Sequence, residues 1–108
     1  MEILEYLEDD GQSPVAIWMA ELDATAEAKV TVAITRLGFG NTSNVKSVGA
    51  SVFELKVDFG PGYRVYFGKD GEKIVILLAG AAKKRQQRDI KLAQARWNDY
   101  KTRKKGRV

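Results

Sequence analysis

The 108-residue sequence contains no cysteine and no histidine. Without cysteine the chain forms no disulfide and offers no thiolate nucleophile. The common zinc sites are built from Cys and His side chains, so a zinc site is not expected, and Ser–His and Cys–His catalysis are excluded. Any acid–base chemistry must therefore use Lys, Asp, Glu or Tyr, with Arg available to stabilise negative charge.

Long apolar runs are also missing. No run approaches the roughly 20 residues that a membrane-spanning helix needs, and the acidic N-terminus MEILEYLEDDG has no signal-peptide character. The segment GAAKKR lacks the ending of a phosphate-binding loop, and no carboxylates pair at helical spacing to hold a metal. We therefore expect a single cytoplasmic domain over residues 1–108, with no metal, no cofactor and no membrane partner.

Charge is distributed unevenly along the chain. Residues 1–54 hold nine acidic and three basic side chains, a net charge of −6, whereas residues 83–108 hold eleven basic and two acidic ones, a net charge of +9. This polarity indicates an electropositive face for nucleic acid or for an acidic partner. The alternative is a solvated basic helix, and we expect residues from about 102 to 108 to be a disordered basic tail.

Apolar periodicity predicts the element order β-α-α-β-β-β-α, an α+β domain. A first strand is expected in residues 2–7. Ser13 followed by Pro14 is a typical helix start, and a cap at Asp23 or Thr25 begins a second helix that runs to about Leu37. Two helices joined by so short a connection form an antiparallel hairpin.

The second half of the sequence predicts an antiparallel meander. Alternating side chains from residue 53 to residue 59, the strand of residues 63–67 and the apolar run KIVILL supply its three strands, with the N-terminal strand added to them. The polar stretch of residues 41–50 is expected to be a loop. A last helix to about Lys101 carries an apolar stripe and should pack on the sheet.

The stretch GPGYRVYF places one arginine in a strand that follows a tight turn. Alternation puts Arg64 and Tyr66 on one face, and Lys56 of the preceding strand can share that face if the register allows. With Arg85, which follows the last strand, these side chains would form a basic surface with a ring for stacking. The other interpretation is a solvated sheet face in which Glu54 and Asp58 neutralise the cations.

Three segments together resemble a known family. FELKV, GPGYRVYF and KIVILLAGAAKKRQQRDIKLA, in this order and spacing, resemble the RelE/ParE toxin superfamily, and within it the HigB-like, phage-derived addiction module killer proteins. The resemblance covers about residues 52–100. It implies the RelE-like fold, with which the predicted element order is compatible.

The resemblance also implies a function. A protein of this kind is the toxin of a type II toxin–antitoxin system, silenced by an antitoxin encoded alongside, usually a small helix-turn-helix protein. Many such toxins are mRNA interferases, ribosome-dependent endoribonucleases that act on mRNA in the ribosomal A site beside ribosomal RNA. In that reaction a ribose 2′-OH attacks the scissile phosphate. Two alternatives stay open: a ParE-like, non-catalytic inhibitor of DNA gyrase, and a non-toxic relative that retains only antitoxin binding.

The resemblance assigns roles to individual residues. Arg64 matches the strand arginine of the family and would stabilise the phosphorane. Many relatives place Tyr or His near the start of the last helix, whereas this chain has Asp89 there, as a base or a helix cap. The general base is therefore open, with Lys56 and Tyr66 as further candidates. The full candidate set is Lys56, Arg64, Tyr66, Lys84, Arg85 and Asp89.

Overall fold

A computed structural model describes residues 1–82 and 87–106. The chain is an α+β protein with a RelE-like arrangement of helices and strands, as the sequence predicts. Within the described residues, no helix is both long and apolar enough to cross a bilayer. The elements in chain order are β1 (Glu2–Glu5), α1 (Pro14–Ala20), α2 (Ala24–Gly38), β2 (Val45–Ser47), β3 (Val52–Val57), β4 (Tyr63–Asp70), β5 (Ile74–Ala82) and α3 (Gln87–Lys105).

The five strands form one mixed sheet in the order β1-β5-β4-β3-β2. The pairs β2–β3, β3–β4 and β4–β5 are antiparallel, so the predicted meander is confirmed, and β1 joins it parallel to β5. The β3–β4 register pairs Lys56 with Arg64 and Glu54 with Tyr66. Because successive side chains of a strand point to opposite faces, Glu54 and Lys56 share one face of the sheet with Arg64 and Tyr66.

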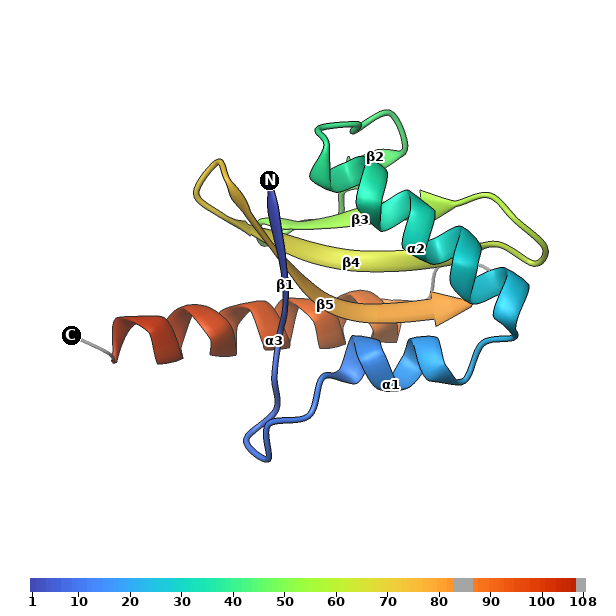
Figure 1. Ribbon diagram of the computed structural model, residues 1–108. Coiled ribbons are helices and arrows are strands. Elements are labelled where there is room, and N and C mark those ends of the chain that lie inside the picture. Colours follow the sequence, from blue (N-terminus) through green and yellow to red (C-terminus); the bar gives the residue numbers. More distant parts are fainter. Residues whose placement is uncertain (83–86, 107–108) are drawn as a thin grey trace.

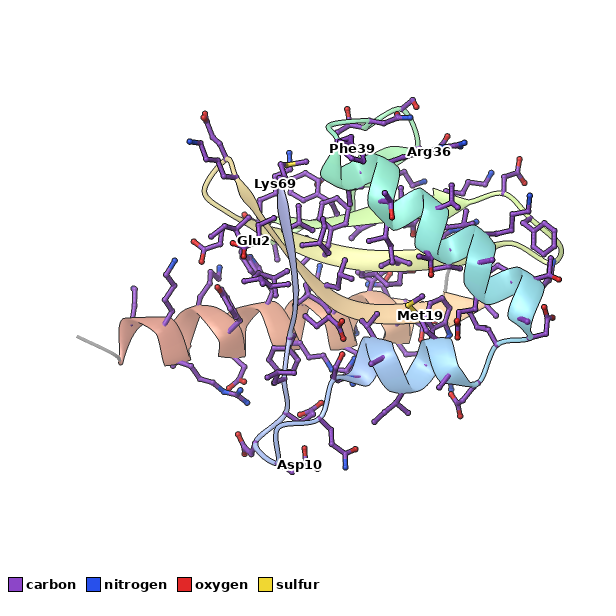
Figure 2. The ribbon with its side chains drawn as sticks, viewed as in Figure 1. Glu2, Asp10, Met19, Arg36, Phe39 and Lys69 are labelled. Atoms are coloured by element: carbon purple, nitrogen blue, oxygen red, sulfur yellow. The ribbon has the colours of Figure 1, made fainter. Side chains whose placement is uncertain are left out.

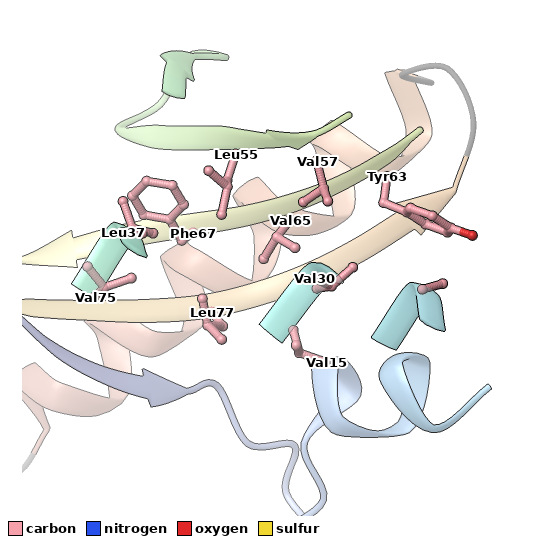
Figure 3. Packing of buried hydrophobic residues seen from close by; sticks show 11 residues of the cluster. Val15, Val30, Leu37, Leu55, Val57, Tyr63, Val65, Phe67, Val75 and Leu77 are labelled. Atoms are coloured by element: carbon pink, nitrogen blue, oxygen red, sulfur yellow. The ribbon is translucent and has the colours of Figure 1, made fainter. Parts of the chain in front are cut away.

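Helices cover both faces of the sheet. Helices α1 and α2 lie on one face and α3 lies on the other, where its C-terminal end runs past the sheet (Figure 1). Strands covered on both faces are expected to be nearly continuous in apolar residues, as β5 is. The core under α1 and α2 consists of Val15, Ala26, Val30, Leu37, Leu55, Val57, Tyr63, Val65, Phe67, Val75 and Leu77 (Figure 3).

Both predicted helix caps in the N-terminal half are present. The Ser13 hydroxyl oxygen accepts a hydrogen bond from the amide of Ala16 at 3.0 Å. The Asp23 carboxylate accepts one from the amide of Ala26 at 2.9 Å, so Asp23 and not Thr25 caps α2. Each cap satisfies a backbone donor that the helix itself leaves without a partner.

Two glycines allow indole rings to lie flat on the sheet. A Cβ atom added to Gly80 would stand 2.1 Å from Cε3 of Trp18 on α1, and one added to Gly68 would stand 2.5 Å from Cδ2 of Trp97 on α3. Neither distance is compatible with a real side-chain contact. The close packing of α1 and α3 on the sheet therefore requires glycine, which has no side chain, at positions 80 and 68.

Two expectations from the sequence are wrong. Within the stretch expected to be a loop, β2 pairs with β3 from Val45 opposite Leu55 to Ser47 opposite Phe53, because the neighbouring strand leaves its edge open for pairing. The tail expected to be disordered from about residue 102 is helical to Lys105. Arg103 donates a hydrogen bond to the Leu7 carbonyl at 2.7 Å, and this bond to the N-terminal segment holds the last turns of α3.

Candidate functional site

The α3-facing side of β3 and β4 carries the predicted cations. Lys56 and Arg64 are direct cross-strand partners, and Glu54, two residues before Lys56, shares their face. On the other side of β3, Lys46 of β2 stands opposite Glu54. The register therefore brings three cations and one carboxylate together at the edge of the sheet.

These four side chains line a hollow of about 300 Å³, completed by the polar segment before β2. Its volume is at the lower end of the range for ligand sites. Because the backbone amide of Lys56 donates to the Asn44 carbonyl at 3.0 Å, this segment is fixed against β3. The lining residues are Ser43, Asn44, Val45, Lys46, Glu54, Lys56 and Arg64.

Glu54 forms an ion pair with Arg64 inside this hollow. Its Oε1 atom lies 3.4 Å from Nε of Arg64, and the two side chains are 2% and 15% exposed. Many charged side chains elsewhere are exposed, among them Glu2, Asp10 and Lys69, which are labelled in Figure 2. Within the described part of the chain, Glu54 is the one charged residue that is buried.

The turn before β4 places the arginine. Gly60 and Gly62 have φ angles of 57° and 88°, a region that favours glycine, so the predicted turn is confirmed. Nη1 of Arg64 lies 3.5 Å from the Tyr63 carbonyl, and a Cβ atom on Gly62 would stand 3.5 Å from the same nitrogen. The guanidinium therefore lies over the turn, with its Nε side toward Glu54.

Tyr66 shares the face of Arg64 but does not reach the surface. Its side chain is fully buried in the core between the sheet and α3, with Ile90, Ala93 and Trp97 of that helix. The expected stacking platform is therefore wrong, because α3 lies across this part of the sheet. The alternative of a solvated face with neutralised cations holds in part: Glu54 pairs with Arg64 and Lys56 is exposed, whereas α3 covers the face at Tyr66.

The remaining predicted site residues lie elsewhere. Asp89 is half-buried in the first turn of α3, where a carboxylate is favoured by the helix dipole, and it is not among the described residues that line the hollow. Lys84 and Arg85 fall outside the described residues. Among the residues that the structure describes, no three Asp or Glu side chains gather closely enough to hold a metal ion.

Sequence reasoning missed Lys46 as a site residue and treated Glu54 only as a neutralising neighbour. The alternation of β3 already placed Glu54 on the face of Lys56, so that signal was present. Lys46 had no comparable signal, since a three-residue strand in a polar stretch has too few residues to show a period.

The charges of the hollow favour an anion. Lys46, Lys56 and Arg64 against Glu54 leave a net charge of +2 at pH 7. Arginine offers a planar fork of donors that fits a phosphate, and lysine a compact charge. A second hollow of about 290 Å³ between β1 and α3 lacks this excess, because its Arg103 and Lys104 already pair with acidic residues.

Comparison with known proteins places the hollow inside a shared region. The model of a family described as phage derived protein Gp49-like (DUF891) matches residues 17–98, which include β2 to β5 and all the described residues of the hollow. An uncharacterized protein of Haemophilus influenzae is 45% identical over 78 residues, which cover 71% of this chain and 79% of that protein.

Proposed function

Because the chain belongs to the phage-derived Gp49-like family, we propose that it is the toxin of a type II toxin–antitoxin system that cleaves mRNA on the ribosome. The family is associated with RelE-like toxins and is compatible with this role. Such a family suggests an antitoxin as a partner. In this proposal the antitoxin is a small helix-turn-helix protein encoded alongside, and the toxin meets mRNA and ribosomal RNA in the ribosomal A site.

The single observation that carries the proposal is the cationic hollow around Arg64. In the proposed reaction a ribose 2′-OH attacks the adjacent phosphorus, and the P–O5′ bond breaks. The products are a 2′,3′-cyclic phosphate and a free 5′-hydroxyl. The pentacoordinate intermediate is more negative than the substrate phosphate, so donors fixed in place stabilise it more than the ground state. Arg64, Lys56 and Lys46 supply such donors from one surface.

Proton transfer in this proposal falls to a residue that lines the hollow. Tyr66 is fully buried, which leaves it no access to a ribose hydroxyl. Lys56 lines the hollow and stands beside Arg64. We therefore propose that Lys56, in its neutral amine form, accepts the proton of the 2′-OH. The leaving 5′-oxygen then takes a proton from solvent or from Asp89, which is not among the described residues that line the hollow.

The second candidate function is inhibition of DNA gyrase without catalysis. One observation favours it: the burial of Tyr66 removes the aromatic ring on which an RNA base would have stacked. A cationic surface that binds a protein partner or DNA needs neither such a ring nor a general base.

Induction in bacterial cells separates the two functions. We would map mRNA 5′ ends after a brief pulse of expression and score plasmid supercoiling in the same cultures. The proposal predicts new 5′ ends aligned with codons in translated mRNAs and normal supercoiling. Trapped gyrase without new ends would support the second function, and normal growth would contradict both. Lys91→Ala, at an exposed position on α3, is the matched control and should behave as the parent chain.

A further inference from the structure

A buried carboxylate at the cationic hollow needs a reason. Glu54 is 2% exposed, and moving a carboxylate out of water costs free energy that only well-placed partners offset. Its neighbour on the same face, Val52, is fully buried and apolar, so a buried position on this face of β3 can pack without a charge. Packing alone therefore does not account for an acid at position 54.

Stability does not account for it either. A buried ion pair replaced by apolar residues of similar volume often leaves a protein equally stable or more stable. The Glu54–Arg64 pair lies at the wall of the hollow and not in the centre of a core. A pair in that position is better explained by what it does to the arginine.

The geometry specifies that effect. Arginine is long and flexible, and holding it in one orientation costs side-chain entropy. Glu54 lies at the Nε atom of Arg64, and the Tyr63 carbonyl lies near Nη1. Because the guanidinium is planar, an ion pair at Nε and a contact at Nη1 together favour one position and one plane for it. A donor fixed before substrate arrives needs no reorganisation during the reaction.

We infer that Glu54 is a positioning residue, which holds the Arg64 guanidinium in the hollow in the orientation that meets the scissile phosphate. Its role is to act through Arg64, and it transfers no proton itself. The inference rests on the proposed function for the identity of the anion. The orientation of Arg64 by Glu54 can be measured without that function.

A double-mutant cycle tests the inference. Glu54→Gln keeps the size of the side chain and removes its charge. For cleavage of ribosome-bound mRNA, we expect this variant to lower kcat about 10- to 100-fold with little change in KM, since small misplacements of a catalytic group have effects of this size. In an Arg64→Ala background the same change should have no further effect, because residues that act as a unit are non-additive.

Chemical rescue gives a second measurement, whose result would not depend on Glu54 if that residue had only a structural role. Truncation of Arg64 to alanine leaves space beside the Glu54 carboxylate, in which a guanidinium ion can bind. Millimolar guanidinium chloride should restore part of the activity of Arg64→Ala. It should restore none in the Glu54→Gln/Arg64→Ala double variant.

The chain offers a closely matched control. Glu8 Oε1 lies 3.5 Å from Nε of Arg96, whose side chain is 17% exposed, so this pair repeats the distance and the buried arginine of the Glu54–Arg64 pair away from the hollow. It differs in its acid, since Glu8 is 45% exposed. Glu8→Gln should leave kcat and KM unchanged. A cooperative thermal transition for each variant will show that it is folded.

The rate at which the Nε–H proton of Arg64 exchanges with solvent, followed by NMR, measures how well Glu54 protects this side of the guanidinium, independently of activity. We expect slow solvent exchange of this proton in the parent chain and in Glu8→Gln, and fast exchange in Glu54→Gln. Equal exchange in all three would overturn the inference, and so would equal loss of kcat with and without Arg64. A parent chain that cleaves no mRNA, but in which Glu54→Gln speeds this exchange, would contradict the proposed function and leave the positioning role standing.

Discussion

Lys56 and Arg64 stand directly opposite each other on β3 and β4, and both side chains line the same hollow. Like charges at directly opposed positions of an antiparallel pair destabilise a sheet. Glu54 offsets this cost for Arg64, with which it forms an ion pair. A pairing that works against stability and is open to solvent at a hollow is typical of a functional site.

Replacing Lys56 should therefore separate stability from activity. In Lys56→Met the opposed charge is gone, so we expect the free energy of unfolding to stay the same or rise by up to about 1 kcal/mol. Cleavage of ribosome-bound mRNA should fall by about 100-fold or more, since Lys56 is the proposed general base. Urea denaturation measures the first quantity. Lys91→Met, at an exposed position on α3, should change neither, and a strongly destabilised Lys56→Met would contradict this account.

Gly80 should tolerate no side chain. A Cβ atom there meets the Trp18 ring at 2.1 Å, so Gly80→Ala must displace α1 or the indole. We expect a loss of about 1–3 kcal/mol in the free energy of unfolding, the usual cost of overpacking. Gly38→Ala is the control: its Cβ would make an ordinary contact at 3.4 Å with Cγ1 of Ile3, and stability should be kept. Equal stability of the two variants would show that the indole does not pack flat on Gly80.

Tyr6 should make stability depend on pH in the alkaline range. Burial and its hydrogen bond to Asp99, 2.7 Å long, raise the pKa of Tyr6 from 10.0 to about 12. The folded state thus favours the neutral phenol, and its contribution is complete below pH 10 and lost as the pH rises toward 12. The free energy of unfolding of the parent chain should therefore fall more steeply over this interval than that of Tyr6→Phe. Parallel curves would contradict the prediction.

The strand patterns are informative about the site because side chains alternate between the two faces of a strand, so the face of each residue follows from its position. Alternation predicts that Glu54 and Lys56 share one face of β3. Whether Arg64 lies on that face depends on the register, which pairs it with Lys56. Pattern alone could not show that α3 buries Tyr66, because an apolar stripe predicts that a helix packs on a sheet and not which residues it covers.

Contacts between distant segments account for the remaining differences. The last turns of α3 are ordered by Arg103, which reaches Leu7 and Asp9 near the N-terminus, and by Lys104, which pairs with Asp70 of the β4–β5 hairpin. In the sequence these residues belong to a basic run that is typical of a disordered tail. Asp99, four residues before Arg103, is a local partner, but Asp9 and Asp70 lie more than thirty positions away from the cations that they neutralise, so no local window of the sequence contains them.

The central claim is that Arg64 stabilises a phosphorane in mRNA, and purified components test it most directly. We would incubate the chain with ribosomes carrying a defined mRNA and identify the 3′ ends of the products. The account predicts cleavage with 2′,3′-cyclic phosphate ends, and a loss of at least about 100-fold in kcat for Arg64→Ala, the usual effect of removing such a donor. The thermal transition of this variant should stay cooperative but move to a lower temperature, because the buried Glu54 loses its ion pair with Arg64. A folded Arg64→Ala variant that cleaves at the parent rate would contradict the claim.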